Sequence, residues 1–545
     1  MRHNLLALAL AALALSAAAQ QQKLVETLEV RVVNVEVIVL DKGGKPVAGL
    51  TKDDFEILED RKPQPITNFY EVRGAEMRTN ESGPAAPEPA EAPARHFLLF
   101  VDVHSLHPIA RKQILGTLEK FVDDQLRPID LASVVAWNRG LKIVAPLTTD
   151  KQAIRAAIAE VATQGSATSI RSDFARVQRE CASLIQMVRT GRMPAHNGYE
   201  HCIGMAREEA ARTTMLSRQL LGGVNVALAT LGEVEAKKVL VLAGANLPQK
   251  PGLDLYLWAN ELFAPYLVGF DKPIARPHEE ERAQRELIER VGRSANAYGV
   301  TLYALAAPAA VDAMSHAVPI DVAGGDSLQR QNTEAAFETL ATLTGGLSGH
   351  ISKMDATLSA IARDLGSYYS IGYRPSSEPK PDRALAVRPK NRAYRIRARQ
   401  SYVSKSSDEQ MNDRVIANIF APSRASEWAV RVETGKPQRT GDDKFTVPID
   451  IIIPSTLTLL PQANTLAGGY IVYVAVGTAE GGLSSMFRQP QGITIAPNEE
   501  ATLRHEPLHF TATLTVRPGE NLLSVGVLDQ VASTAGFTRA KIVAK

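Results

Sequence analysis

The amino-acid sequence predicts a multi-domain chain with a central α/β doubly wound domain, a small N-terminal all-β domain and a C-terminal β-sandwich. The central domain is indicated by short, continuously apolar runs of strand length that alternate with amphipathic helical segments. The β domains are indicated at both ends by alternating apolar and polar residues between Gly/Pro turns. At roughly 150 residues per domain, the 545 residues suffice for three to four domains.

Composition excludes several classes of protein. The chain is 45% hydrophobic and 22% charged, an ordinary globular mixture that a disordered or fibrous chain would not have. Its 61 Lys and Arg residues nearly balance 59 Asp and Glu residues, which leaves a formal net charge of +2. A nucleic-acid binder normally carries a large basic excess, so we expect no nucleic-acid partner.

The N-terminus predicts export. Residues 1–19 read as a cleavable signal peptide: Arg2 precedes a Leu/Ala run over residues 5–15, and small residues follow at 16–19. The apolar run is shorter than the about twenty residues needed to span a bilayer. A short buried helix is the alternative interpretation. Because no later segment is long and apolar enough to cross a membrane, we predict a secreted or periplasmic protein without a transmembrane segment.

Residues 24–73 predict the small all-β domain. Strands are expected within 28–40, at 55–59 and at 66–72, separated by turn sequences. A core of this size is marginal alone, so we expect it to pack on a neighbour. Residues 74–94, rich in Pro, Ala and Glu, predict a linker.

Residues 95–403 predict the α/β domain, with helical insertions. Strands are expected at 97–101, 131–137, 141–146, 239–242, 300–305 and 368–373. Helices are expected at 109–125, 151–162, 172–187, 203–231, 253–270, 279–297, 333–343 and 356–365. This alternation is typical of right-handed βαβ units.

Residues 404–545 predict the C-terminal β-sandwich. Its strands are expected at 447–453, 470–476, 509–516 and 522–528, between Pro/Gly turns. No repeat of solenoid period is visible in the sequence.

The two cysteines, Cys181 and Cys202, predict a disulfide in an exported protein. Such a bond would stabilise the fold by about 3 kcal/mol. Two buried free thiols are the alternative, and the absence of a CxxC sequence argues against a redox centre.

Several segments spread along the chain carry a resemblance to a known family. They are residues 43–51 with Asp54 and Phe55, Phe97–Asp102, Leu340–Gly346, Tyr368–Pro375 and Arg397–Tyr402. They resemble the VWFA-related secreted proteins found mainly in acidobacteria, over nearly the whole mature chain. The resemblance implies a Rossmann-like von Willebrand factor A (vWA) domain in the middle. It also implies non-enzymatic binding to a protein or cell-surface ligand.

The resemblance further implies a divalent-cation site after the first buried strand, built from Asp-x-Ser-x-Ser, a Thr and a second Asp. Asp102 matches the first Asp, but His104 and Leu106 stand where the serines belong. Thr168 is the candidate Thr, and residues 243–245 are Ala-Gly-Ala where an Asp would be expected. Mg²⁺ prefers about six oxygens. We therefore expect a degenerate metal-ion-dependent adhesion site with Asp102 capping backbone amides and no cofactor, Mg²⁺ or Mn²⁺ being the alternative.

A second interpretation of the same segment remains open. Asp102, His104 and His107 form an Asp-x-His-x-x-His sequence, whose imidazoles would suit Zn²⁺. The alternative function is therefore a metal-dependent hydrolase, against solvent-facing or capping histidines. A structural envelope component is the third reading.

Arg395, Arg397 and Arg399 alternate along a strand and are expected to project from one face. They could recognise an anionic glycan, a lipid headgroup or an acidic partner. The alternative is an edge strand that uses charge to prevent aggregation. The sequence indicates neither the oligomeric state nor the identity of the partner.

Overall fold

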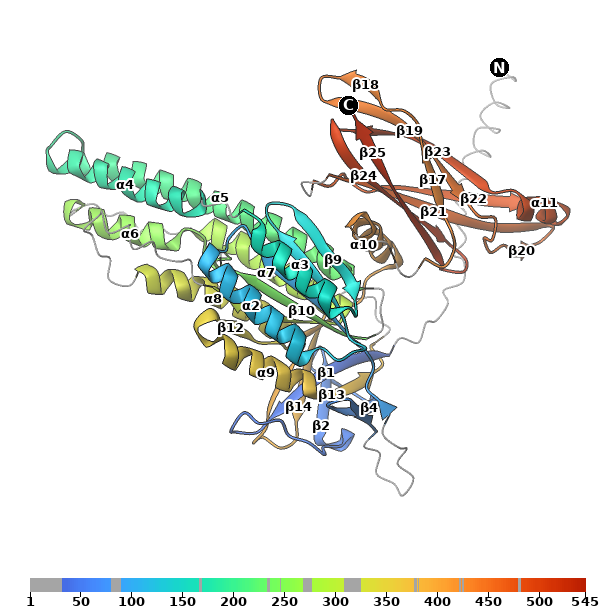
Figure 1. Ribbon diagram of the computed structural model, residues 1–545, viewed down its shortest axis with the longest axis horizontal. Helices are drawn as coiled ribbons and strands as arrows, with labels where there is room; N and C mark the ends of the chain where they lie inside the picture. Colours follow the sequence, from blue (N-terminus) through green and yellow to red (C-terminus); the bar gives the residue numbers. More distant parts are fainter. Residues whose placement is uncertain are drawn as a thin grey trace, which may run out of the picture.

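The chain is a mixed α/β protein with several sheets, seen here in a computed structural model (Figure 1). The structure describes residues 32–79, 90–165, 169–232, 236–245, 247–267, 277–307, 325–376, 380, 382–420, 423, 426–478 and 482–545. Among these residues, no helix is long and apolar enough to cross a membrane.

A six-stranded sheet lies at the centre, in the order β12-β11-β10-β7-β8-β9. Its strands are β7 (Arg95–Asp102), β8 (Leu131–Trp137), β9 (Leu141–Thr148), β10 (Lys237–Gly244), β11 (Val300–Ala306) and β12 (Ser348–His350). Neighbouring strands are parallel except β8 and β9. The chain builds the sheet from β7 outward to β9, then returns to β10 on the other side of β7. The order of strands therefore reverses between β7 and β10.

Helices cover both faces of this sheet (Figure 1). One core contains α2 (Pro108–Gln125), α3 (Lys151–Thr163) and α9 (Met354–Gly366). The other contains α5 (Ala195–Ala229), α7 (His278–Tyr298) and α8 (Gly325–Leu343). Successive side chains of β7 alternate between the two cores: Leu99 packs in the first, Leu98 and Phe100 in the second. This double burial explains the continuous apolar run in the sequence.

A helical arm extends beyond the sheet (Figure 1). It consists of α4 (Ser169–Arg189), residues 195–214 of α5 and α6 (Leu253–Phe263), which share a separate apolar core. The Cys181–Cys202 disulfide joins α4 to α5 inside that core. The helix expected over 253–270 ends at Phe263, where a 3₁₀ turn containing Pro265 follows.

The N-terminal strands form sheets together with strands that follow α9. One sheet has the order β15-β1-β13-β4-β5-β6 and another β16-β14-β2-β3. Their strands are β1 (Val33–Leu40), β2 (Phe55–Glu59), β3 (Lys62–Gln64), β4 (Ile66–Arg73), β5 (Glu76–Arg78), β6 (Ala90–Glu91), β13 (Ser367–Tyr373), β14 (Asp382–Pro389), β15 (Arg395–Ala398) and β16 (Ser401–Val403). Strand pairing thus joins residues 367–403, placed by the sequence analysis with the α/β domain, to the N-terminal strands.

Buried charges connect these sheets to the central one. Lys237, at the start of β10, lies 2.9 Å from the Glu36 carboxylate of β1. Its ammonium also lies 3.4 Å from the ring centroid of Tyr368 in β13. Both contacts require β1 and β13 to lie against the amino end of the central sheet.

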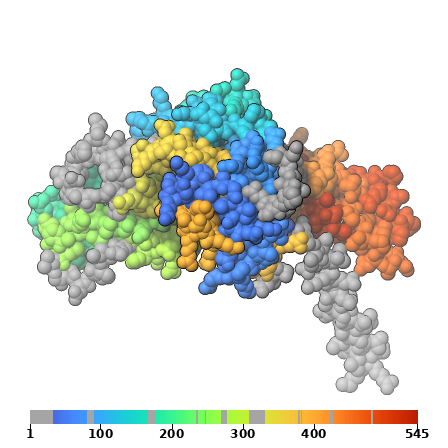
Figure 2. All heavy atoms as spheres, turned by 90° about the horizontal axis from the view of Figure 1, so that it is seen from below, coloured from blue at the N-terminus to red at the C-terminus, as the bar shows by residue number. Residues whose placement is uncertain are grey.

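The C-terminal part packs two antiparallel sheets around one apolar core. One contains β17 (Arg431–Thr434), β18 (Gln438–Gly441), β19 (Lys444–Ile453) and β23 (Leu508–Val516). The other contains β20 (Leu460–Gln462), β21 (Thr465–Thr478), β22 (Phe487–Ile495), β24 (Gly519–Asp529) and β25 (Ala535–Ala544). Figure 2 shows these residues at the end of the molecule opposite the helical arm.

Two helices also lie in this C-terminal part, where the sequence analysis expected strands alone. They are α10 (Ser407–Phe420) and the short α11 (Glu500–His505). Ser406 and Glu409 form a reciprocal capping box at the start of α10. Apolar residues of α10 pack on β21, β24 and β25, so the helix covers the outer face of that sheet.

Candidate binding site

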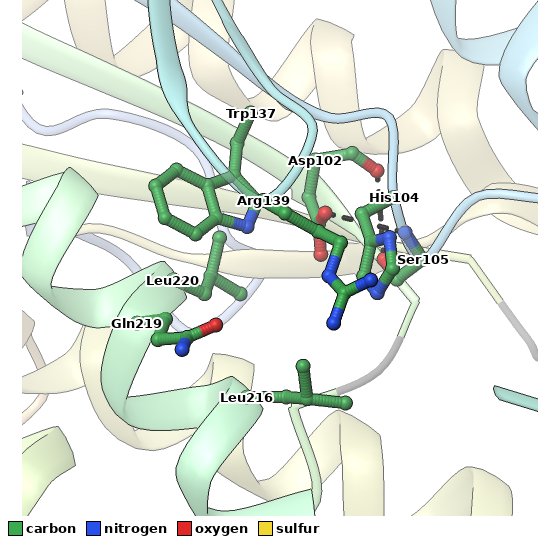
Figure 3. A pocket seen from close by; sticks show the side chains of 8 residues that line it. All are labelled: Asp102, His104, Ser105, Trp137, Arg139, Leu216, Gln219 and Leu220. Carbon is green, nitrogen blue, oxygen red and sulfur yellow. Dashed lines mark hydrogen bonds between the residues drawn. The ribbon is translucent and has the colours of Figure 1, made fainter. Parts of the chain in front are cut away.

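A small, shallow pocket opens at the carboxyl end of β7, where the order of strands reverses (Figure 3). Open α/β sheets bind ligands at such a crevice. The lining residues come from the loop after β7, the end of β8, the β8–β9 hairpin and the middle of α5. They are Asp102, His104, Ser105, Trp137, Arg139, Leu216, Gln219 and Leu220.

Asp102 forms the base of the pocket. Its Oδ1 accepts a hydrogen bond of 3.2 Å from the backbone N–H of Ser105. The Ser105 hydroxyl in turn accepts one of 2.9 Å from the backbone N–H of Ala245, which ties this loop to the end of β10. Burial raises the pKa of Asp102 to about 6, although the hydrogen bonds from Ser105 act in the opposite direction. Asp102 therefore has the backbone-capping contact that the sequence analysis expected.

Gly244 permits the close approach of β10 to Asp102. A Cβ at this position would lie 3.3 Å from the Asp102 Cβ and 3.3 Å from the Phe337 ring. The segment where the resemblance implied a second metal-binding Asp therefore has a glycine whose backbone lies close to Asp102, with little room for a side chain.

His104 is buried in the wall of the pocket, with 6% of its surface exposed. Its backbone N–H donates to the Trp137 carbonyl at 3.2 Å. Its Nδ1 has no hydrogen-bond partner among the described residues. Burial, with Arg139 and Arg212 nearby, lowers the pKa of His104. The ring is therefore neutral at pH 7 and offers one N–H and one lone pair.

Arg139 lies at the tip of the β8–β9 hairpin, within Asn138-Arg139-Gly140. Its φ of 63° is in the left-handed region, which costs a non-glycine residue roughly 1–2 kcal/mol. The side chain lies beside His104 at the pocket mouth (Figure 3). In the part of the chain that the structure describes, its guanidinium has no hydrogen bond or ion pair. A strained position thus presents an exposed, unpaired positive charge to the pocket.

The described residues do not fit a divalent cation. Asp102 supplies one carboxylate, whereas Mg²⁺ takes about six oxygens and the guanidinium of Arg139 would repel it. Thr168 lies outside the described residues. No group of three or more His, Cys, Asp or Glu residues suited to a metal is found among the residues described. The expected absence of a cofactor stays a prediction to be tested, with Mg²⁺ or Mn²⁺ as the alternative.

His107 does not line the pocket. Its Nδ1 accepts a hydrogen bond of 3.3 Å from the backbone N–H of Ile109 and so caps the start of α2. Pro108, at the first helical position, supports the same helix start. The Asp102, His104 and His107 set is therefore divided between a pocket and a helix cap.

The three arginines after β14 do not form one exposed basic surface. Arg397 donates to the Asp364 carboxylate of α9 at 2.5 Å. Arg399 donates to the carbonyls of Asn34 and Asn296, at 2.6 and 3.1 Å. Only Arg395 is exposed. The side chain of Arg397 in β15 therefore turns towards α9, and that of Arg399, just after β15, turns towards β1 and α7.

Two acids in the helical arm, the buried Glu209 and the half-buried Asp254, carry no signal in the sequence. Glu209 is 8% exposed, and its carboxylate lies 3.6 Å from the Arg212 guanidinium. Burial raises the pKa of Glu209 to about 7 and that of Asp254 to about 6. Neither residue belongs to a motif, and their burial follows from the packing of α6 against α5.

Replacing Glu209 with Gln should therefore stabilise the arm at pH 8 and have little effect at pH 5. The folded-state pKa is raised, so ionisation opposes folding and stability falls as pH rises through about 7. We expect a gain of about 2–3 kcal/mol at pH 8, from roughly 1.4 kcal/mol per unit of pKa shift. Hydrogen exchange of α5 and α6 between pH 5 and 8 measures this gain in stability. The exposed neighbour Glu208→Gln is the control, and equal responses of both variants would contradict the prediction.

No protein-family model matches the chain, and no curated protein matches it. Solved structures to which it is similar include an aerotolerance-related membrane protein from Bacteroides fragilis. That match has 10% identity and a TM-score of 0.24, and covers 50% of this chain and 98% of that one. The vWF domain of the type V pili tip protein Mfa5 from Porphyromonas gingivalis has 10% identity and a TM-score of 0.25, with 51% and 96% covered.

Proximal thread matrix protein 1 from the mussel byssus, with a zinc-occupied MIDAS motif, is a further similar structure. It has 16% identity and a TM-score of 0.22, and the match covers 50% of this chain and 48% of that one. These TM-scores are low, so conclusions about function rest on the residues of the pocket.

The sequence pattern indicated Asp102 and His104 but not Ser105, Trp137, Arg139 or the three residues of α5 that also line the pocket. The carboxyl ends of adjacent parallel strands meet at one edge of a sheet. The hairpin after β8 could therefore have been placed beside Asp102. Nothing comparable in the sequence indicated which residues of α5 would face the pocket.

Proposed function

We propose that this chain is an exported, non-enzymatic binding protein that engages a protein or cell-surface ligand at the pocket containing Asp102. In this proposal a central, doubly wound vWA-like domain carries the site, and β domains flank it. The binding does not use a bridging cation. The observation that supports the proposal is the pocket itself, a concave site at the reversal of strand order where polar and charged side chains lie beside three apolar ones.

The contacts of the pocket residues favour binding over catalysis. Catalysis by a nucleophile needs a base within hydrogen-bond reach of it. The Ser105 hydroxyl contacts the Ala245 N–H and the Asp102 carbonyl instead. The metal-dependent hydrolase needs His107 beside His104, and His107 caps α2. The pocket residues therefore offer recognition groups rather than a reacting pair.

Binding is tested with mature, fluorescently labelled protein on intact cells and purified envelopes of the organism that makes it. Gln219 is exposed on α5 at the pocket, so Gln219→Trp should fill the pocket without disturbing a core. We expect this variant to lose at least tenfold in retention, and Gln186→Trp, on the exposed face of α4, to bind as the wild type does. Equal retention of both variants would exclude the pocket. Retention no greater than that of a non-binding reference protein would exclude the binding function.

Metal addition and removal test the cation-free part of the proposal. A ligand that binds only the folded state raises the melting temperature once it exceeds its dissociation constant. We expect EDTA, Mg²⁺, Mn²⁺ and Zn²⁺ at millimolar concentration to shift it by less than about 1 °C, and EDTA to leave cell binding unchanged. A clear shift with Mg²⁺ or Mn²⁺, or loss of binding in EDTA, would point to cation-bridged adhesion. A response to Zn²⁺ alone would favour the hydrolase.

A further inference from the structure

We propose that the chain forms a two-fold symmetric homodimer in which strand β23 pairs edge to edge with β23 of a second copy. The two strands run antiparallel and join the sheets that contain them into one continuous sheet. This inference is independent of the pocket and of the ligand proposed for it. The partner that the edge of β23 fits is thus the same strand of another molecule.

The free edge of β23 presents unpaired backbone groups. Strand β23 pairs with β19 over all nine of its residues without a bulge, and with no other described strand. Thr513 lies opposite Pro448, whose carbonyl accepts a hydrogen bond of 2.8 Å from the Gly435 N–H on the other side of β19. Backbone groups of successive residues alternate in direction, so every second residue of β23 directs its N–H and C=O away from β19. These residues are His509, Thr511, Thr513 and Thr515.

Other edge strands of the same sandwich carry features that hinder edge pairing. Strand β22 contains Arg488 and Pro490, β25 has the exposed Arg539 and Lys541, and β18 has a register shift after Arg439. Charges, prolines and bulges of this kind block the addition of a further strand. The β23 sequence, LHFTATLTV, has no proline and no Lys, Arg, Asp or Glu. Its edge is therefore open to another strand.

The inner face of β23 is only half covered. Phe510, Ala512 and Leu514 pack against the core of the sandwich but stay partly exposed, whereas their partners on β19 are almost completely buried. The ring of Phe510 lies 6.3 Å from that of Phe487 in β22, a residue that is 42% exposed. A strand added beside β23 would cover this apolar row, because alternate side chains of a strand share one face. Burial of apolar surface then adds to the backbone hydrogen bonds.

A second copy of β23 matches this edge in one register. With Ala512 on the two-fold axis, all nine residues have a partner, and Thr511 lies opposite Thr513 of the second copy. Every residue with outward backbone groups then meets another such residue, as a hydrogen-bonded antiparallel pair requires. Phe510 lies opposite Leu514 of the second copy, an apolar cross-strand pair. A shift by one residue would place outward groups opposite inward ones.

The residues that flank β23 carry complementary charges. Glu506 precedes the strand, Arg517 follows it, and both are exposed. Their charged neighbours Arg504 and Glu520 already form ion pairs within the chain. The antiparallel arrangement brings Glu506 of each copy to the end of the strand pair where Arg517 of the other copy lies. A parallel pairing would bring the two glutamates together, so the charges favour the two-fold arrangement.

Sedimentation velocity of the full mature chain, from sub-micromolar to tens of micromolar concentration, tests the dimer. We expect a shift from monomer to dimer and no larger species, because a two-fold contact closes on itself. Thr513→Pro removes an outward N–H and should raise the dimer dissociation constant at least tenfold, with an unchanged melting temperature of the sandwich, since proline is tolerated at such edge positions. A monomer at every concentration, or wild-type dimerisation by Thr513→Pro, would overturn the proposal.

Paired charge variants test the register. Thr511→Lys with Thr513→Lys places like charges opposite each other and should abolish the dimer, and Thr511→Glu with Thr513→Glu should do the same. A mixture of the two variants should form a heterodimer, which also shows that both have folded. Thr494→Lys, at an exposed position of β22, is the control and should dimerise as the wild type does. A mixture that stays monomeric would contradict pairing in this register.

Hydrogen exchange at single-residue resolution locates the contact. The amides of Thr511, Thr513 and Thr515 should exchange slowly at high protein concentration and fast after dilution. Those of Phe510 and Ala512 face β19 and should be protected at both concentrations. A dimer whose concentration-dependent protection lies elsewhere in the chain would overturn the assignment to β23.

Discussion

Replacing Asp130 with alanine is expected to destabilise the part of the protein around the central sheet by about 3–5 kcal/mol, because it leaves a buried guanidinium without its counter-ion. Asp130 and Arg95 are both almost completely buried, with Arg95 Nη2 2.6 Å from Asp130 Oδ2. The other carboxylate oxygen lies 2.9 Å from Arg127 Nη2. Arg127 also donates to the carbonyls of Ala92 and Pro93, so the loss would loosen the segment that leads into β7.

The ionisation of Asp130 gives the sign of a pH effect. Burial alone would raise the pKa of Asp130, but hydrogen bonds from Arg95 and Arg127 outweigh it and hold the pKa below its ordinary value. The stabilisation is therefore present above the unfolded-state pKa near 4 and is lost as the pH falls through the lower folded-state value.

Calorimetry of the wild type and two variants measures the effect of the Asp130 substitution. The control is Asp123→Ala in the neighbouring helix α2, where Asp123 pairs with Arg155 at 3.0 Å. The side chains of both residues in this pair are about 45% exposed. An exposed pair of this kind contributes about 0–1 kcal/mol. Equal losses in the two variants would show that the Arg95–Asp130 pair is not the buried counter-ion pair described here.

Removing the disulfide should loosen the helical arm by about 3 kcal/mol while leaving the central sheet largely intact. Cys181 and Cys202 are separated by 21 positions, and a loop of this length gives that estimate from unfolded-state chain entropy. Both cysteines lie in the core of the arm, which is separate from the two cores of the sheet. Segments with their own core open with their own free energy.

The double variant Cys181→Ala with Cys202→Ala removes the bond without leaving a free thiol. Hydrogen exchange and limited proteolysis should show faster opening of α4, α6 and the first half of α5, with unchanged protection of β7 and β10. Wild-type protein in a reductant should behave as the variant does. Uniform loss of protection over arm and sheet would contradict an independently opening arm.

The strands of the central sheet could be predicted because burial on both faces demands a continuous apolar run. Residues 97–101 predict the strand that the structure places at Arg95–Asp102, and residues 239–242 predict β10 in the same way. An apolar run does not indicate which neighbouring strands it will pair with. Residues 368–373 form β13 as expected, yet β13 pairs with β1 and β4, because long-range contacts decide the partner.

Two further differences have physical causes in the sequence. Helix α10 begins with a Ser-x-x-Glu capping box at Ser406 and Glu409, a start signal that outweighs the strand pattern downstream. Strand β22 contains Pro490 and Gly492, which read as a turn, but β22 pairs only with β21 among the described strands and so lies at a sheet edge that tolerates proline.

The candidate site was predictable in part. Asp102 and His104 stand at the end of a predicted buried strand, where the resemblance implied a cation site. Predicting Arg139 as a pocket residue would have required the knowledge that β8 lies beside β7. Predicting Leu216 and Gln219 would have required the position of α5 on the sheet. That position depends on Gly223, where a Cβ would lie 2.7 Å from the Trp137 ring, a contact that no local pattern reveals.

Helix α5 has a mechanical consequence, because one continuous rod belongs to two cores. Its 35 residues span about 50 Å, with the disulfide-linked arm at one end and the sheet at the other. Leu216, Gln219 and Leu220 lie between these ends, just before the tight contact of Gly223 with Trp137. The helix therefore connects the tip of the arm directly to the residues that line the pocket.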